Sequence, residues 1–386
     1  MTLPADFLDD ERALEWLARI RTTLAQIAMP EERPLRIMNV CGGHERSVSR
    51  LGLRGLLPPG IELIPGPGCP VCVCPEEDLY QALQLALCER VRLLAFGDML
   101  RVPVNVAPGA PRSLLEARAA GADVVPLASP MEAVVAANAQ PDKPHVFFVA
   151  GFETTLAPVA ALIVQGLPAN LWILSAGKLT WPAVAHLLAR RQTDGTPARA
   201  FDGLIAPGHV ATLMGTDEWR FVTEMHRLPV AVAGFHAVSL LAGVYSVLRQ
   251  HGEGRSFVDN AYPELVHPQG NPRAQALLHQ VFDIVDSPWR GIGTLPASGW
   301  ALRSTWAAHD ANRHFPDYRQ DARRRAGAMP PGCACADVVM GLRYPNQCPL
   351  YGKGCTPATP IGPCMVSDEG ACRIWWSSGV RERVVS

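Results

Sequence analysis

Eight short apolar segments recur along this chain, and each is followed directly by a loop that contains glycine or proline. Their starts lie roughly 20 to 30 residues apart, about the length of a β-strand plus a returning helix. The apolar residues are consecutive rather than alternating, which is typical of parallel strands covered by helices on both faces. We therefore predict an α/β protein with strands at 36–40, 61–65, 92–96, 123–127, 145–150, 171–176, 202–206 and 229–233.

The eight segments form two sets of four with similar spacing, which predicts two similar small parallel-sheet α/β domains, residues 33–140 and 141–235. The alternative is one doubly wound sheet of about eight strands. An amphipathic helix is expected within residues 1–32, packing on a C-terminal domain, residues 236–386. That last region is predicted to be helical and rich in loops.

The composition excludes several classes of protein. Hydrophobic residues make up 48% of the 386 positions and charged residues 18%, enough for well-formed cores. The 35 basic and 36 acidic residues leave a net charge of −1, so neither nucleic acid nor an anionic membrane is expected as a partner. The acidic start has no uninterrupted apolar stretch, and we expect a cytoplasmic protein without a signal peptide.

The eleven cysteines fall into two groups, between residues 41 and 88 and between residues 333 and 372. In a reducing compartment, such thiols are more often metal ligands or redox groups than structural disulfides. The sequence therefore predicts two separate thiol sites.

The second group lies in a loop-like segment that has little apolar surface and needs a covalent or metallic link to fold. A four-thiolate iron–sulfur cluster, a zinc site and redox disulfides all remain open. The absence of paired CxxC knuckles favours the cluster over zinc, but spacing alone does not choose four ligands. The six thiols are Cys333, Cys335, Cys348, Cys355, Cys364 and Cys372.

The first group combines Cys41-Gly-Gly-His44-Glu45 with a Cys69-Pro-Val-Cys72 dithiol one strand later. The dithiol can close into a disulfide, and a nearby helix N-terminus can acidify one thiol. Cys41, Cys69 and Cys72 converge if their two strands are neighbours in the sheet.

Polar residues stand at the ends of the other predicted strands. Each alone is more often a cap or an ion pair than a ligand, but together they predict a cleft for a polar ligand or a partner. Cys88, Trp181 and Trp289 are predicted to pack in the core. The polar residues are His44, Glu45, Asp98, Glu153, Lys178 and His209.

These motifs together resemble the signature of the HypD family, maturation factors of [NiFe] hydrogenases. The resemblance runs in order from about residue 36 to residue 372. It is carried by CGGHE at 41–45, GPGCPVC at 66–72, FGDMLRVP at 96–103, GFETT at 151–155, PGHV at 207–210, WRGIG at 289–293 and CTPATPIGPCMVSDEGAC at 355–372.

The resemblance implies an iron–sulfur C-terminal domain and a scaffold function. Cys333, Cys348, Cys355 and Cys372 would bind a [4Fe-4S] cluster, and Cys335 with Cys364 would form a redox relay. With the small chaperone HypC, Cys41 would hold an iron that receives cyanide from HypE and carbon monoxide. The Fe(CN)2CO group would then pass to the hydrogenase large-subunit precursor.

The remaining roles are hypotheses. Cys69 and Cys72 would exchange electrons, while His44 and Glu45 would tune Cys41 or move protons. His236, Ser239, Gly177 and Cys74 depart from the family pattern, which puts the loops that carry them in question. The alternatives are an iron–sulfur dithiol/disulfide reductase and a zinc-stabilised binding module.

Overall fold

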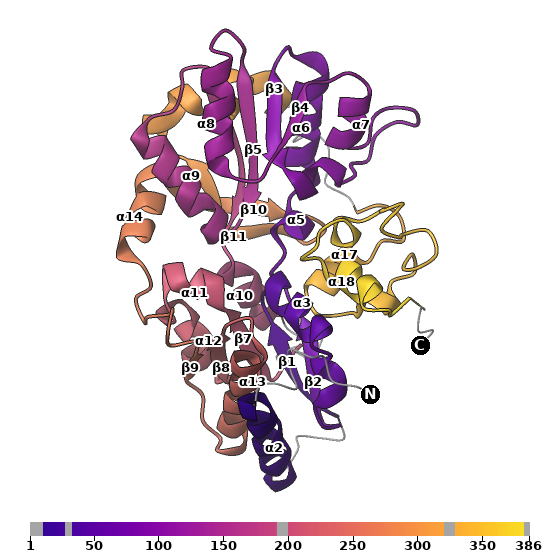
Figure 1. Cartoon of the computed structure of the whole chain (residues 1–386), viewed down its shortest axis with the longest axis vertical. Coiled ribbons are helices and arrows are strands. Elements are labelled where there is room, and N and C mark those ends of the chain that lie inside the picture. Colours follow the sequence, from indigo (N-terminus) through magenta and orange to yellow (C-terminus); the bar gives the residue numbers. More distant parts are fainter. Residues whose placement is uncertain (1–10, 28–32, 191–199, 320–328, 382–386) are drawn as a thin grey trace.

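The computed structural model describes residues 11–27, 33–190, 200–319 and 329–381 and is an α/β protein with two sheets and a cysteine-rich tail (Figure 1). All eight predicted segments are strands, and three further strands follow them. They are β1 Leu35–Asn39, β2 Ile61–Pro65, β3 Arg92–Phe96, β4 Val124–Leu127, β5 His145–Gly151, β6 Leu171–Lys178, β7 Gly203–Pro207, β8 Val230–Ala233, β9 Val258–Ala261, β10 Phe282–Trp289 and β11 Gly293–Leu302.

The first sheet is parallel throughout and has the order β2-β1-β7-β8-β9. The second has the order β10-β11-β6-β5-β3-β4, in which β3 to β6 are parallel and the β10–β11 hairpin is antiparallel. Each sheet thus combines strands from both halves of the predicted arrangement, and the boundary expected between residues 140 and 141 does not separate the sheets. The spacing of apolar segments predicts only where strands occur. The pairing of strands depends on contacts between residues that are far apart in the chain.

Helices cover both sheets, as the consecutive apolar residues of the strands require. Near the first sheet lie α2 Glu11–Gln26, α3 Gly42–Arg50, α4 Leu53–Leu56, α11 Gly208–Met214, η2 Asp217–Trp219, α12 Arg220–His226 and α13 Ala237–Gly252. Near the second lie α6 Glu76–Cys88, η1 Gly97–Arg101, α7 Leu114–Ala119, α8 Pro130–Ala139, α9 Glu153–Gln165, α14 Pro272–Val281, η3 Ser304–His309 and α15 Ala311–His314. The short α5 Pro70–Val73 and α10 Trp181–Ala189 lie between the sheets in Figure 1.

The N-terminal helix α2 buries Ala13, Leu17 and Ile20 in one cluster with Leu241 and Val244 of α13. Its packing partner therefore lies within residues 236–386. However, α13 belongs to the first sheet, because its apolar face also covers β7 and β8.

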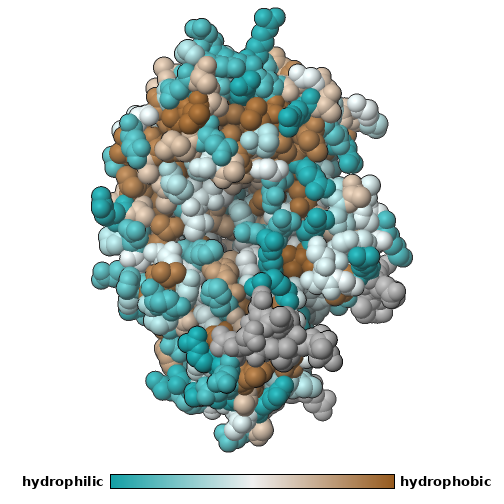
Figure 2. Space-filling model, in the orientation of Figure 1, coloured by the Kyte–Doolittle hydropathy of each residue, from teal (hydrophilic) through white to brown (hydrophobic). Residues whose placement is uncertain are grey.

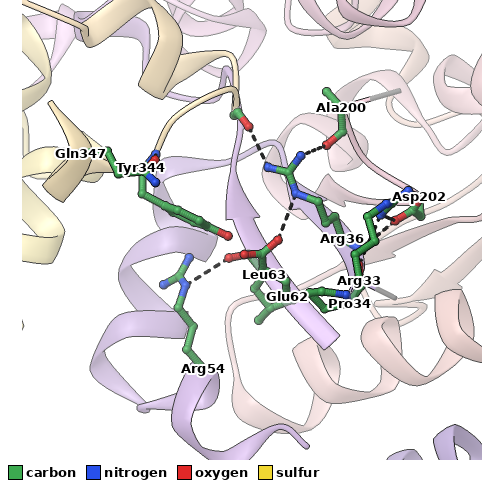
Figure 3. Close-up of polar contacts among 11 residues, drawn as sticks. Arg33, Pro34, Arg36, Arg54, Glu62, Leu63, Ala200, Asp202, Tyr344 and Gln347 are labelled. Carbon is green, nitrogen blue, oxygen red and sulfur yellow. Dashed lines mark hydrogen bonds and ion pairs between the residues drawn. The ribbon is translucent and has the colours of Figure 1, made fainter. Parts of the chain in front are cut away.

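The tail lies beside α3 and α5 and contains α17 Cys335–Val339, η4 Pro345–Gln347, η5 Pro363–Met365 and α18 Ala371–Ser377 (Figure 1). One arginine anchors it to the first sheet. Arg36 of β1 donates to Glu62 at 3.0 Å, to the carbonyl of Ala200 at 2.7 Å and to the carbonyl of Gly341 at 3.2 Å (Figure 3). The tail is thereby held at a fixed place against the start of β1.

The large aromatic residues pack as predicted, but one cysteine does not. Trp289 is buried, and Trp181 packs partly buried against Phe221. Cys88 was predicted to lie in the core, but it is exposed, because α6 ends there and its buried face is formed by residues such as Leu85. Apolar side chains also reach the surface over the second sheet (Figure 2), including Met131 and Val135 of α8.

Candidate functional site

The carboxyl ends of the first sheet place four chemically distinct groups together. Cys41 follows β1, the Cys69–Cys72 segment follows β2, His209 follows β7, and Phe235 follows β8. In Figure 1 these ends are directed toward the second sheet and the tail. Such an edge is where ligands bind in open α/β sheets.

Cys41 is the residue before the first turn of α3, and it is partly exposed. Burial of its sulfur, and next the negative charge of Glu369, raise the pKa of the thiol to about 12. The backbone N–H groups of His44 and Gly43 act in the opposite direction. The Cys41 thiolate is therefore favoured only when a cation, such as a metal ion, is bound to it.

The dithiol segment lies directly against Cys41. The backbone N–H of Gly42 donates to the carbonyl of Gly68 at 3.1 Å. A Cβ at Gly68 would overlap the backbone of Cys41, so only glycine allows this approach. Cys69 and Cys72 are joined by a disulfide and are both buried. The predicted convergence of the two loops is therefore present.

His44 is fully buried and its ring packs, tilted, against that of Phe235, with 4.8 Å between the ring centroids. The same phenylalanine ring lies 4.0 Å from the ring of His209. His44 Nε2 lies 2.9 Å from the carbonyl of Ala233, which requires a proton on that nitrogen. Burial lowers the pKa of His44 to about 4, so the imidazole is neutral at physiological pH.

Glu45 is buried and both of its carboxylate oxygens accept hydrogen bonds. Oε1 accepts from the indole of Trp375, and Oε2 accepts from Asn39 at 3.0 Å and from Arg54 at 2.8 Å. The carboxylate therefore joins β1, α3 and the tail helix α18. This arrangement suits a structural anion better than a proton donor.

The thiols of the tail gather around Cys335. Its thiol interacts with those of Cys333, Cys364 and Cys372. The backbone N–H of Cys372 also donates to the sulfur of Cys364 at 3.2 Å. The hydrogen bonds from the thiols of Cys335 and Cys372 lower the pKa of Cys364. Cys364 is thus well suited to carry negative charge in thiol exchange.

The other two tail cysteines lie in the same region. Cys355 is close enough to Cys333 and Cys335 for their charges to add to the effect of burial, which raises its pKa. Cys348 is buried in the same apolar cluster. A Cβ at Gly362 would overlap the sulfurs of Cys335 and Cys333, which shows how closely the loop covers these thiols.

Soft thiolate donors fit an iron–sulfur cluster. In the part of the chain that the structure describes, no three His, Cys, Asp or Glu side chains are arranged to hold a single metal ion. A cluster has widely separated corners, so its ligands need not converge on one point. By the family resemblance, Cys333, Cys348, Cys355 and Cys372 are the residues that would hold it.

Three of the other predicted polar residues lie at the ends of strands of the second sheet. Glu153 accepts from the N–H and the hydroxyl of Thr180 at 2.8 and 2.7 Å, at the ends of β5 and β6. Lys178 is buried at the end of β6 and donates to the hydroxyl of Ser287 at 2.7 Å. Asp98 accepts from Ser367 of the tail at 3.2 Å. Burial, and next the charge of Asp98, raise the pKa of Glu369, which lies against Gly42, so Asp98 lies near the Cys41 loop.

The structure shows where the four residues that depart from the family pattern lie. Gly177 pairs with Trp300 where β11 joins β6. The Ser239 hydroxyl accepts from Gly234 and donates to Ala261, which fixes the loop after β8. Together with exposed His236 it lines a cavity of about 1090 Å³ beside α2. Cys74 is fully buried just after α5, and burial raises its pKa.

Two residues near Cys41 come from the tail and were not singled out from the sequence. Glu369 lies against Gly42, where a Cβ would overlap it. Trp375 reaches Glu45 across a sequence separation of 330 residues. The motif that contains Glu369 is visible in the sequence, but its contact with Cys41 depends on the docking of the tail.

Known proteins that are similar to this chain identify its family. The family model HypD, described as "Hydrogenase formation hypA family", matches residues 13–379. The chain belongs to the HypD family. The hydrogenase maturation factor HypD of Rhodobacter capsulatus is 38% identical over 382 residues, covering 98% of both chains. The HypD of Azotobacter vinelandii is 38% identical over 383 residues, covering 98% of this chain and 97% of the relative.

A further HypD, that of Escherichia coli, is 37% identical over 379 residues, covering 96% of this chain and 97% of the relative. The HypD family is a family of hydrogenase maturation factors. Among the helices that the structure describes, none combines the length and the apolar character needed to span a bilayer.

Proposed function

We propose that this chain is a cytoplasmic scaffold on which an iron ion receives its cyanide and carbon monoxide ligands. The position of Cys41 carries the proposal. It is a partly exposed thiol at a helix N-terminus, and its loop touches the loop of the Cys69–Cys72 disulfide. Low-spin Fe(II) with such ligands is soft, and a thiolate is a suitable anchor for it.

The raised pKa of Cys41 supports a role in which this thiol binds the iron and is deprotonated only while the iron is bound. Without iron, burial and Glu369 keep the thiol protonated, which protects it from oxidation. Binding of iron displaces the proton and leaves a neutralised thiolate. The N–H groups of Gly43 and His44 then stabilise the sulfur that holds the cargo.

The disulfide beside Cys41 supplies the redox part of the proposal. Reduction of the Cys69–Cys72 bond takes two electrons and two protons and yields two thiols. A [4Fe-4S] cluster held by Cys333, Cys348, Cys355 and Cys372 would supply single electrons. Cys335 and Cys364 would act as the relay pair, and their mutual contact supports that assignment.

The proposed partners are a HypC-type chaperone, a HypE-type cyanide donor and the hydrogenase large-subunit precursor. A dithiol/disulfide reductase is the alternative, but the burial of both Cys69 and Cys72 argues against direct exchange with a protein disulfide.

Infrared spectroscopy of the chain co-purified anaerobically with its HypC-type partner tests the scaffold function. We expect bands of iron-bound cyanide and carbon monoxide in the wild type and in Cys88→Ala, a control at an exposed thiol. Cys41→Ala is expected to lose the bands while its melting temperature is unchanged. Bands of normal intensity in Cys41→Ala would refute the role of Cys41 as the anchor.

A further inference from the structure

One stretch of the tail, the 364–375 segment, contacts α3 at two places. At the first turn of the helix, Glu369 lies against Gly42, where a Cβ would overlap both the backbone oxygen and the Cβ of the glutamate. Further along the helix, the indole N–H of Trp375 donates to Oε1 of Glu45 at 2.7 Å. Gly42 and Glu45 are three residues apart and therefore lie on one face of α3. The segment thus follows this face of the helix.

The same segment carries two of the tail thiols. Cys364 and Cys372 are both buried, and the backbone N–H of Cys372 donates to the sulfur of Cys364 at 3.2 Å. A Cβ at Gly370 would overlap the carbonyl of Cys364, so the chain turns tightly between the two cysteines. Cys372 and Trp375 are three residues apart in α18, which places them about one helical turn from each other.

The hydrogen bond between Trp375 and Glu45 is supported at both of its ends. Glu45 is only 2% exposed, and its other carboxylate oxygen accepts from Arg54 at 2.8 Å. The Arg54 guanidinium also lies 5.2 Å from the ring centroid of Trp375, and the ring of Tyr344 stacks on the indole with 5.3 Å between the centroids. A hydrogen bond to a carboxylate is stronger than one between neutral groups. Its two partners are held in place, so it can transmit a displacement of α18 to α3.

We propose that Trp375 is a positioning residue that couples the tail thiols to the Cys41 helix through its hydrogen bond to Glu45. When Cys372 is bound in a cluster, the first turn of α18 is fixed, and Trp375 then holds α3 with Cys41 at its N-terminus. The inference rests on the proposed function, because it needs the cluster. Coupling between two binding sites is reciprocal, so iron on Cys41 stabilises the binding of the cluster to the same extent.

The coupling predicts how cluster loading changes the amide exchange of α3. Backbone N–H groups exchange with solvent when a helix opens locally, and additional fixed contacts make such opening rarer. In the wild type, loading is expected to slow the exchange of residues 42–50 by about tenfold. The variant Trp375→Phe keeps an aromatic ring but lacks the N–H donor. Most of the slowing is therefore expected to disappear in this variant.

Hydrogen–deuterium exchange of the full chain, measured by mass spectrometry, tests the proposal. Each variant is measured after anaerobic reconstitution with iron and sulfide, and again after a chelator has removed the iron, with iron and sulfide analysis of the same samples. The matched control is Trp376→Phe, the next residue of α18, whose ring packs against Tyr351 within the tail at 6.0 Å. This control is expected to show the wild-type slowing. Exchange of α13, residues 237–252, reports global opening.

Three outcomes would overturn the proposal. If the wild type takes up no iron and sulfide, the proposed cluster and this inference fail together. If the wild type loads normally but residues 42–50 exchange equally in both states, or if the slowing persists in Trp375→Phe, the inference alone is wrong. If Trp375→Phe accelerates exchange in α13 as much as in α3, Trp375 supports the whole fold and does not couple the two sites.

Discussion

The indole of Trp375 donates its N–H to Oε1 of Glu45 over 2.7 Å, joining the last helix of the tail to the helix that follows Cys41. Arg54 reinforces this contact, since it forms a 2.8 Å ion pair with Glu45 and lies 5.2 Å from the ring centroid of Trp375. The C-terminal segment therefore supplies part of the surroundings of Cys41, the thiol that we propose binds iron.

Glu45→Gln is expected to destabilise the protein by about 2 kcal/mol, because the amide leaves one N–H donor unpaired and weakens the bonds from Arg54 and Trp375. The free energy of unfolding from urea titration measures the effect. Glu116→Gln, at an exposed ion pair, is the control and is expected to change little. Equal stability of both variants would contradict the anchoring role.

Stability is expected to fall as the pH decreases from 6.5 toward 4 because of His44. Its pKa is about 4 in the folded chain against an ordinary 6.5, so the unfolded chain binds the proton first on acidification. The loss amounts to about 3 kcal/mol at most. His44→Gln removes this titration and should flatten the pH dependence of unfolding, whereas His236→Gln, at an exposed site, should leave it unaltered.

Glu369→Gln is expected to lower the pKa of the Cys41 thiol, since it removes a negative charge that opposes the thiolate. Alkylation of Cys41 by iodoacetamide at pH 8, followed by peptide mass spectrometry, should become several-fold faster. The neighbouring Asp368→Asn provides a matched control at an exposed carboxylate. If both substitutions change the alkylation rate equally, the overall charge of this region, and not Glu369 itself, sets the pKa of Cys41.

Iron content in the variants Cys348→Ala and Cys335→Ala distinguishes the proposed cluster ligands from the proposed relay pair. We expect Cys348→Ala to lose most of its iron and to destabilise the tail, because binding of the metal group contributes folding free energy there. Cys335→Ala should retain about four irons per chain, measured by iron analysis after anaerobic purification. The ligand assignment is mistaken if Cys335→Ala is the variant that loses iron.

Local structure was predictable from the sequence, but strand partners were not. Consecutive apolar residues located β1 to β8, since a buried parallel strand needs them on both faces. The β10–β11 hairpin was missed because β10 is exposed at Asp283 to Asp286 and carries no continuous apolar signal. The pairing of β1 with β7 depends on contacts that no local pattern records.

One part of the candidate site was predictable from the sequence and another part was not. Cys41 and the Cys69–Cys72 segment could be placed together, because each follows a strand and β1 and β2 are consecutive. The contributions of Glu369 and Trp375 could not, since the tail docks through side-chain contacts such as those of Arg36 and Glu45. Glycine spacing and cysteine count carry no information about that docking.

The interleaved strand order has a consequence for protein synthesis. Strand β7 leaves the ribosome roughly 170 residues after β1, its neighbour in the finished sheet, and the helix that contains Trp375 emerges later still. A nascent chain therefore exposes Cys41 long before the groups that surround it exist. The surroundings of Cys41 are therefore completed only after the segment that contains Glu369 and Trp375 has been made.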